Sequence, residues 1–329
     1  LEKPGNIVLA DDLHAQAFMD LTEAAGEHDA HIWAQLGHAG ALAYPPLGRP
    51  VGPSAIRMPE LSCEEMSLAE IEAIPRLFAC GAARAKAVGF TGVQVHGAHG
   101  FLLSQFLSPL FNRRGDRWGG SLRNRARLLL ETIDAVRSAV GSYFPVALKM
   151  NASDRIHGGF EEGEARELVS LLDDTSVDLI EISGGTYFPG AKSAGGGRSG
   201  EPYFRDFAET LRSRTSKPIM LTGGFRTCRQ ASDALAADAS DCIGLARALV
   251  LDTELPANWF KSDGTDPDFP QLRSTKPGAV TAWYTMRLAR LARGLDEGQD
   301  MDADAALEHY ERRDRERHAA WRQRFGTSG

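Results

Sequence analysis

Two histidines three residues apart are the strongest chemical signal in this sequence. His96 and His99 lie in Val93–Leu103 (VQVHGAHGFLL), where an apolar run gives way to a turn of small residues. If that run is a strand of a parallel barrel, both imidazoles lie at its carboxyl end, where barrel enzymes place their active sites. Two imidazoles there can donate hydrogen bonds to one carbonyl or phenolate oxygen. The alternative is a capped strand end with structural histidines, and zinc is disfavoured because no third ligand has suitable spacing.

Two glycine-containing turns in the C-terminal half of the sequence suggest a phosphate-binding site. The segments are Leu221–Thr227 (LTGGFRT) and Ile243–Leu249 (IGLARAL). Gly223 and Gly224 would let backbone N–H groups approach a phosphate closely, and Arg247 adds a cation where a helix begins. Ordinary tight turns are the alternative. Because the two turns follow adjacent predicted strands, together they favour a phosphate-bearing cofactor or substrate.

Two polar residues interrupt otherwise apolar strands. Gln35 and Lys149 each need a partner if those strands are buried. Gln35 offers a donor and an acceptor, which match the pyrimidine edge of a flavin. Lys149 could place positive charge near the N1–C2=O region of such a ring. A salt bridge at the bottom of the barrel is the alternative interpretation of Lys149.

The elements that would position these residues alternate between strands and helices. Six short apolar runs read as buried strands: 31–36, 92–96, 146–150, 179–183, 218–222 and 241–246. Helical periodicity and capping signals predict helices over 11–26, 67–89, 121–141, 161–174, 203–214, 227–238, 279–294 and 306–325. Such alternation predicts an α/β fold with a parallel sheet. The absence of an early G-x-G-x-x-G favours a (β/α)8 TIM barrel over a doubly wound sheet.

A complete barrel of this kind has eight strands, and the sequence shows six. We therefore expect the first strand, the first helix and the second strand to be absent from this chain. The predicted division is an incomplete barrel over 1–260 and a helical extension over 261–329.

Composition narrows the classes of partner. The net charge is −7, and no apolar stretch is long enough to span a membrane, so neither nucleic acid nor a membrane is the expected partner. No signal peptide is visible. The four cysteines contain no C-x-x-C pair, which favours reduced thiols in a cytoplasmic protein over a disulfide framework, an iron–sulfur cluster or another metal site.

Several motifs together resemble the old yellow enzyme family of NADH:flavin oxidoreductases. The likeness runs from about Pro4 to about Trp259 and is carried by Gly89–Arg127, Gln35–Gly40 (QLGHAG), Val146–Asp154 (VALKMNASD) and Asp178–Tyr187 (DLIEISGGTY). The resemblance implies a barrel that holds FMN and takes hydride from NADH or NADPH. The reduced flavin then passes hydride to the β-carbon of an activated alkene.

The resemblance also implies roles for individual residues. His96 and His99 would bind the activating oxygen of a small-molecule substrate, while Gln35 and Lys149 would touch the flavin ring. The residues expected to hold the phosphate are Gly223, Gly224, Ala246 and Arg247.

Three departures from the family pattern qualify these roles. Phe101 occupies the usual position of a tyrosine proton donor and has no O–H, so we expect water, Tyr187 or Tyr44 to supply the proton. Ala41 replaces an arginine, and the family's first strand has no counterpart. Two other functions therefore stay open: a flavin-linked oxidase or quinone-type reductase, and a truncated, non-catalytic flavin-binding protein. The loops 41–66 and 184–200 are expected to frame the substrate, and a homo-oligomer is possible.

Overall fold

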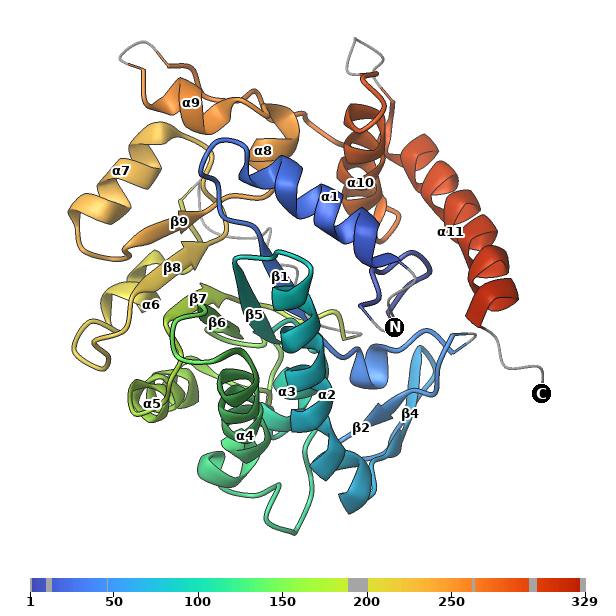
Figure 1. Cartoon of the computed structure of the whole chain (residues 1–329), viewed down its shortest axis with the longest axis vertical. Helices are drawn as coiled ribbons and strands as arrows, with labels where there is room; N and C mark the ends of the chain where they lie inside the picture. The colour runs from blue at the N-terminus through green and yellow to red at the C-terminus, as the bar shows by residue number, and fades with distance from the viewer. Residues whose placement is uncertain are drawn as a thin grey trace.

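Six parallel strands form the centre of the molecule (Figure 1). The computed structural model describes residues 2–9, 14–45, 47–188, 201–261, 264–295 and 301–325. The strands lie side by side in chain order as β1 (Trp33–Leu36), β5 (Gly92–Gly97), β6 (Val146–Asn151), β7 (Leu179–Ser183), β8 (Ile219–Thr222) and β9 (Cys242–Gly244). Each of the six predicted strands is therefore confirmed, and their consecutive order is that of a (β/α)8 barrel. Within the described residues, β1 and β9 each pair with one neighbouring strand.

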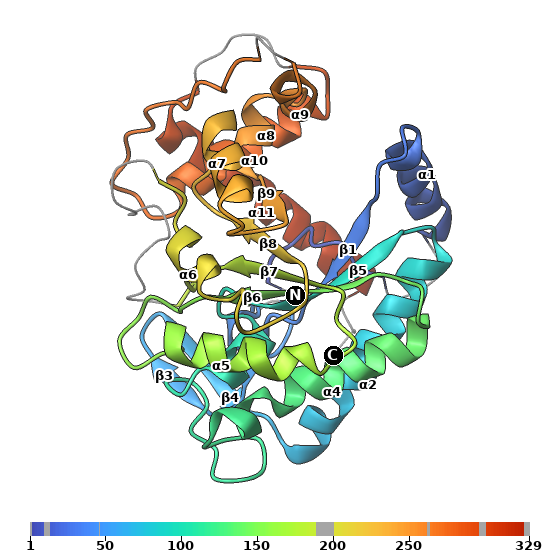
Figure 2. The same cartoon turned by 90° about the vertical axis from the view of Figure 1, so that its left-hand side faces the viewer.

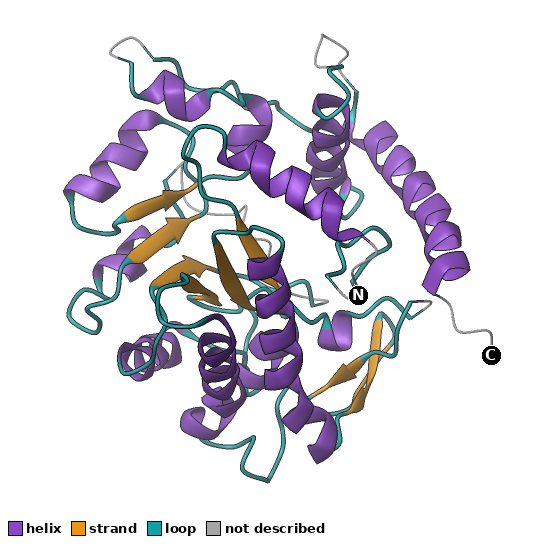
Figure 3. Cartoon of the chain, viewed as in Figure 1, coloured by secondary structure: helices purple, strands orange, loops and turns teal. Residues whose placement is uncertain are grey.

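Helices connect consecutive strands and cover the sheet (Figure 3). They are α2 (Leu68–Ala87), α3 (Leu102–Leu107), α4 (Leu122–Val140), α5 (Glu162–Asp173), α6 (Arg205–Glu209) and α7 (Cys228–Ala236). The apolar faces of α2, α4 and α5 pack with the strands into one continuous core, and these three helices lie together along one side of the sheet (Figure 2). The strands β5, β6 and β7 are apolar and buried along most of their length, as expected where both faces of a sheet are covered.

Local sequence signals explain where these helices begin. Ser67 Oγ accepts a hydrogen bond from the backbone N–H of Glu70 at 3.3 Å, and the Glu70 carboxylate accepts one from the Ser67 N–H at 2.8 Å. This reciprocal capping box is one of the capping signals from which the helix over 67–89 was predicted. The helix α2 continues through Pro75 without a break. Thr227 and Gln230 form a second capping box at the start of α7.

The loop between β1 and α2 contains structure that the sequence pattern did not predict. A 3-10 turn, η2 (Gly40–Leu42), precedes a small sheet of β2 (Val51–Gly52), β3 (Ile56–Met58) and β4 (Leu61–Glu65). These strands are too short and irregular to give an alternating pattern.

The remaining helices lie at the two ends of the chain. α1 (Ala15–Gly26) precedes β1, and α8 (Arg247–Leu251), α9 (Leu255–Trp259), α10 (Ala279–Leu291) and α11 (Ala303–Phe325) follow β9. α10 and α11 pack against each other, and Arg287 of α10 donates a hydrogen bond to the carbonyl oxygen of Val250 in α8. No helix among the described residues is both long enough and apolar enough to cross a membrane.

Candidate active site

The two predicted histidines meet at the carboxyl end of β5. Their ring centroids are 5.3 Å apart, and the rings are nearly perpendicular. His96 is the fifth residue of β5, in register with Lys149 of the neighbouring strand β6. The chain then turns, and His99 adopts a left-handed conformation with φ of 61°, which is uncommon for a residue other than glycine. This turn brings the second ring back beside the first.

Hydrogen bonds from two further strands hold His99 in this conformation. Its backbone N–H donates to Oδ1 of Asn151 at 3.0 Å, and its ring Nε2 lies 2.9 Å from Oγ of Ser183. Asn151 in turn donates to Oδ1 of Asp154 and to the carbonyl oxygen of Gly185, each at 2.9 Å. Asn151 is 1% exposed, so it acts as a buried link between β6 and the turn after β7.

His96 has a different environment. His96 is 7% exposed, and the centroids of its imidazole ring and of the Phe101 ring are 4.8 Å apart. The buried Nδ1 has no hydrogen-bond partner among the described residues. Orphaned polar atoms of this kind are rare in folded proteins, and a bound molecule, ion or water usually supplies the partner.

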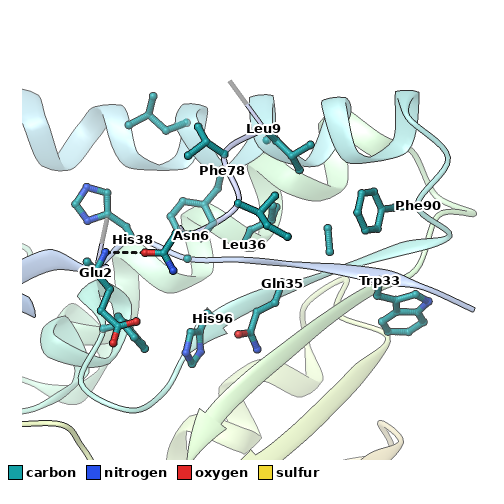
Figure 4. A pocket seen from close by; sticks show the side chains of 18 of the residues that line it. Glu2, Asn6, Leu9, Trp33, Gln35, Leu36, His38, Phe78, Phe90 and His96 are labelled. Atoms are coloured by element: carbon teal, nitrogen blue, oxygen red, sulfur yellow. Dashed lines mark hydrogen bonds between the residues drawn. The ribbon is translucent and has the colours of Figure 1, made fainter. Parts of the chain in front are cut away.

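A cavity of about 950 Å³ opens beside the histidines. His96, His99, Phe101 and Tyr187 line one part of it, and the cavity continues around the edge of β1 that faces away from β5. In Figure 4, Gln35 and His96 lie on one side of β1, whereas Leu36, Phe78 and Leu9 lie on the other. The N-terminal segment contributes further lining residues, including Glu2 and Asn6. A small organic molecule would fit a cavity of this size.

Both histidines are neutral at physiological pH. Burial, followed by the nearby His99 and Lys149, lowers the pKa of His96 from 6.5 to about 3. Burial and the positive charge of Lys149 lower the pKa of His99 to about 4, with Glu181 acting weakly in the opposite direction. Burial lowers the pKa of His38, which also lines the cavity, to about 4. Neutral imidazoles can still donate one N–H each to a substrate oxygen.

These lowered pKa values predict that acid destabilises the fold. Between about pH 6.5 and pH 4 the unfolded chain binds protons at these histidines and the folded chain does not, so stability falls as the pH falls. At pH 5 we expect each of the three histidines to lower the free energy of unfolding by about 2 kcal/mol relative to its value at pH 7. Urea unfolding at the two pH values measures the total. In His96→Asn, which cannot titrate, the pH difference should shrink by about 2 kcal/mol, and an unchanged difference would contradict the assignment.

Beside the histidines, five polar side chains from five strands form one hydrogen-bonded layer. We call this the polar layer, and its members are Gln35, Gln94, Lys149, Glu181 and Thr222. Gln35 donates to Gln94 at 2.6 Å, and Gln94 donates to Glu181 at 2.7 Å. Lys149 forms an ion pair with Glu181 at 2.7 Å. Lys149 therefore does have a carboxylate partner, but the pair lies level with His96 rather than at the bottom of the barrel.

The predicted phosphate residues lie at the carboxyl ends of β8 and β9. Gly223 and Gly224 have φ of 124° and 88°, and a side chain at Gly224 would press on the backbone of residues 201–203. Ala246 is the N-cap of α8 and Arg247 its first residue. Arg247 is exposed, and its guanidinium lies 5.9 Å from the centre of the Tyr284 ring. None of the four lines the cavity beside the histidines, so their role as a phosphate site stays a prediction.

The structure distinguishes the two tyrosines that could replace the missing proton donor. The Tyr187 ring lies 6.0 Å from both the His99 and the Phe101 rings, and Tyr187 lines the cavity. Tyr44 instead packs edge-on against His318 of α11 and is not a lining residue.

Ala41 is 1% exposed and donates its N–H to Gln105.

The residues present fit an FMN ring at this end of the sheet. One N–H of Gln35 is engaged by Gln94, and no described residue donates to its carbonyl oxygen, which can accept from the pyrimidine N–H of a flavin. Lys149 supplies a cation in the same layer. Among the described residues, no cluster of three or more His, Cys, Asp or Glu side chains is arranged to bind a metal ion.

Five residues of the site were not predicted from the sequence: Gln94, Asn151, Glu181, Ser183 and Thr222. Gln94 and Glu181 are polar positions inside apolar strands, the same signal that identified Gln35 and Lys149. Asn151 and Ser183 end their strands and carry no such signal, because polar residues are common there. Residues 189–200, within the loop expected to frame the substrate, lie outside the described residues.

Comparison with known proteins identifies relatives for most of the chain. The model of the NADH:flavin oxidoreductase / NADH oxidase family matches residues 3–262. An NADH-dependent flavin oxidoreductase from Neonectria sp. (strain DH2) is 38% identical over 231 residues, which are 67% of this chain and 30% of that protein. An NADPH dehydrogenase from Geobacillus thermodenitrificans (strain NG80-2) is 35% identical over 262 residues, which are 79% of this chain and 75% of that protein.

A solved structure supports the same fold. The old yellow enzyme homologue from Zymomonas mobilis superimposes with a TM-score of 0.68 at 24% identity, over 82% of this chain and 78% of that chain. The chain thus spans 30% of the length of one relative and 75% of another.

Proposed function

Because the chain belongs to the NADH:flavin oxidoreductase / NADH oxidase family, which includes the old yellow enzymes, we propose that it is an FMN-dependent oxidoreductase that uses NADH or NADPH to reduce an activated, enone-type alkene. FMN is the cofactor of this family. When bound, FMN supplies hydride transfer from the reduced nicotinamide to the acceptor. We assign the cofactor-binding part to residues 1–260 and treat 261–329 as a helical extension.

The observation that carries this proposal is the pair of neutral histidines beside the polar layer. Two N–H donors side by side can bind the carbonyl oxygen of an enone and stabilise the negative charge that develops on it when hydride reaches the β-carbon. Gln35 and Lys149 would hold the pyrimidine edge of FMN. Gly223, Gly224, Ala246 and Arg247 are the proposed phosphate residues, with two left-handed glycines and an exposed guanidinium as their support.

Spectroscopy of the purified protein tests the proposal directly. We expect the protein, as isolated or after reconstitution with FMN, to show the visible absorption of oxidised flavin. Anaerobic NADH or NADPH should bleach it, and an enone such as cyclohexenone should restore it. A protein that does not bind FMN would overturn the assignment.

A second candidate function is a flavin-linked oxidase or quinone-type reductase. Phe101 favours it, since this residue lies against His96 and has no proton to give to a substrate carbon. In the same experiment, colour that returns with a quinone or oxygen but not with any enone would support this function. Bound FMN that no nicotinamide reduces would instead indicate a non-catalytic flavin-binding protein.

We propose Tyr187 as the proton donor for alkene reduction. Partial burial of the side chain, followed by the nearby Glu2, raises the pKa of Tyr187, so its O–H keeps the proton at neutral pH. Tyr187→Phe should therefore lower kcat for an enone about 10²-fold. Flavin reduction by NADH, measured by stopped-flow absorbance, should be unchanged. Tyr44→Phe is the control, and equal enone rates in wild type and Tyr187→Phe would leave solvent water as the donor.

A further inference from the structure

Glu181 is the most heavily used acceptor in the polar layer, and the proposed mechanism gives it no role. It is 6% exposed at the middle of β7. Three side chains donate to its two oxygens, each at 2.7 Å: Gln94 to Oε2, and Lys149 and Thr222 to Oε1. A carboxylate that accepts this many hydrogen bonds in the interior must be matched to its surroundings, because an unpaired buried charge is strongly destabilising.

The charge of Glu181 also decides which way two amides point. An ionised carboxylate only accepts hydrogen bonds, so Gln94 must turn its NH2 group toward Glu181. The Gln94 carbonyl oxygen then faces Gln35 and accepts from the Gln35 NH2 group. As a result, the Gln35 carbonyl oxygen is the atom left without a partner among the described residues. The orientation of the Gln35 amide is thus set by Glu181 of β7, although two strands lie between β7 and β1.

Glu181 acts on Lys149 as well. Burial alone would raise the pKa of Glu181, but the charge and hydrogen bond of Lys149, together with Thr222 and Gln94, bring it below its usual value. The carboxylate is therefore ionised at neutral pH. Its negative charge, 2.7 Å from the ammonium group, offsets much of the positive charge that Lys149 presents to the end of the sheet.

We propose that Glu181 is a positioning residue that sets both the orientation of the Gln35 amide and the net charge that Lys149 presents to the flavin, and so keeps the reduction potential of bound FMN low. The inference rests on the proposed FMN site. It involves no chemistry at Glu181 itself, which accepts hydrogen bonds and does not exchange a proton.

The test is the two-electron midpoint potential of bound FMN in Glu181→Gln, measured by anaerobic titration against reference dyes. The variant keeps the side-chain volume and removes the charge. Reduction adds negative charge to the flavin. Removal of the carboxylate that neutralises Lys149 should therefore favour the reduced flavin at least tenfold, which corresponds to a rise of ~30 mV in the midpoint potential of a two-electron couple. Sulfite, which forms an anionic flavin adduct, should bind at least tenfold more tightly to the variant.

Thr222→Val is the matched control, because it removes a hydrogen bond to the same carboxylate oxygen but leaves the charge in place. Its potential should stay within a few millivolts of wild type, even if its thermal stability falls. Equal potentials in wild type and Glu181→Gln, or equal shifts in Glu181→Gln and Thr222→Val, would overturn the inference.

If Glu181→Gln does not fold, Glu181→Ala replaces it, because this variant also removes the charge and leaves room for water beside Lys149. Its potential should be at least ~30 mV above that of the wild type, and equal potentials would overturn the inference. Failure of the wild-type protein to bind FMN overturns the proposed function itself. A flavin-loaded variant with an unshifted potential overturns only the role of Glu181.

Discussion

Replacement of His96 by alanine is expected to lower kcat/KM for an enone about 10²- to 10³-fold. This range is typical for the loss of one donor to a developing oxyanion. His96 lies in regular strand backbone, so the substitution causes no strain in the main chain. It removes one of the two imidazoles whose centroids lie 5.3 Å apart at the cavity wall. Steady-state kinetics with cyclohexenone and a fixed nicotinamide concentration measure the loss.

The partner variant His96→Asn separates chemistry from packing. An asparagine offers an N–H donor from a similar position, so we expect it to recover at least tenfold of the lost kcat/KM. His28→Ala, at an exposed position in the loop between α1 and β1, is the unrelated histidine control. Enone kinetics within threefold of wild type in His96→Ala would show that the histidine pair does not bind the substrate oxygen. FMN content should remain that of wild type throughout.

Replacement of Asn151 by leucine should lower the free energy of unfolding by about 3 kcal/mol or more. The side chain is 1% exposed and makes three hydrogen bonds of 2.9 to 3.0 Å. Leucine would leave the His99 N–H and the Gly185 carbonyl unpaired inside the protein and would remove one of the donors to the Asp154 carboxyl group. Each such group costs about 1–3 kcal/mol, although the contributions do not simply add. Urea unfolding with an unchanged m-value measures the difference.

Asn151→Asp tests whether the cause is hydrogen bonding rather than shape. The aspartate has nearly the same volume and can still accept from the His99 N–H. Its ionised form would instead place a negative charge against the Asp154 carboxyl group and an acceptor against the Gly185 carbonyl. We therefore expect a loss of stability at pH 7 similar to that of Asn151→Leu. An unfolding free energy within 1 kcal/mol of wild type for both variants would mean that Asn151 is not the link described here.

The accuracy of the sequence predictions varied with the range of the interactions involved. The capping box of Ser67 and Glu70 was predictable because its two members lie within one helical turn. The helix predicted over 203–214 is shorter, Arg205–Glu209, since the residues after it form turns. The small sheet β2–β4–β3 was not predicted, because its strands of two to five residues are held by pairing with one another rather than by local preference.

The candidate site shows the same dependence on range. His96 and His99 were found because they lie only three positions apart in the sequence. The glycine turns were found because glycine is informative wherever φ is positive. Glu181 was missed even though it carries the signal of a polar residue in a buried strand. Its importance comes from Gln94, Lys149 and Thr222, which lie 87, 32 and 41 residues away in sequence.

The sequence by itself determined the six strands, their parallel α/β class, the histidine pair and the resemblance to a flavin-dependent family. These features depend on periodicity, composition and short motifs, which local physics imposes on a single stretch of chain. Only the tertiary structure decided that Lys149 is paired with Glu181, that Gln35 is oriented through Gln94, and that Tyr187 rather than Tyr44 lines the cavity. Hydrogen bonds and ion pairs between strands depend on register and on which residues the sheet places side by side, and no single segment contains that information.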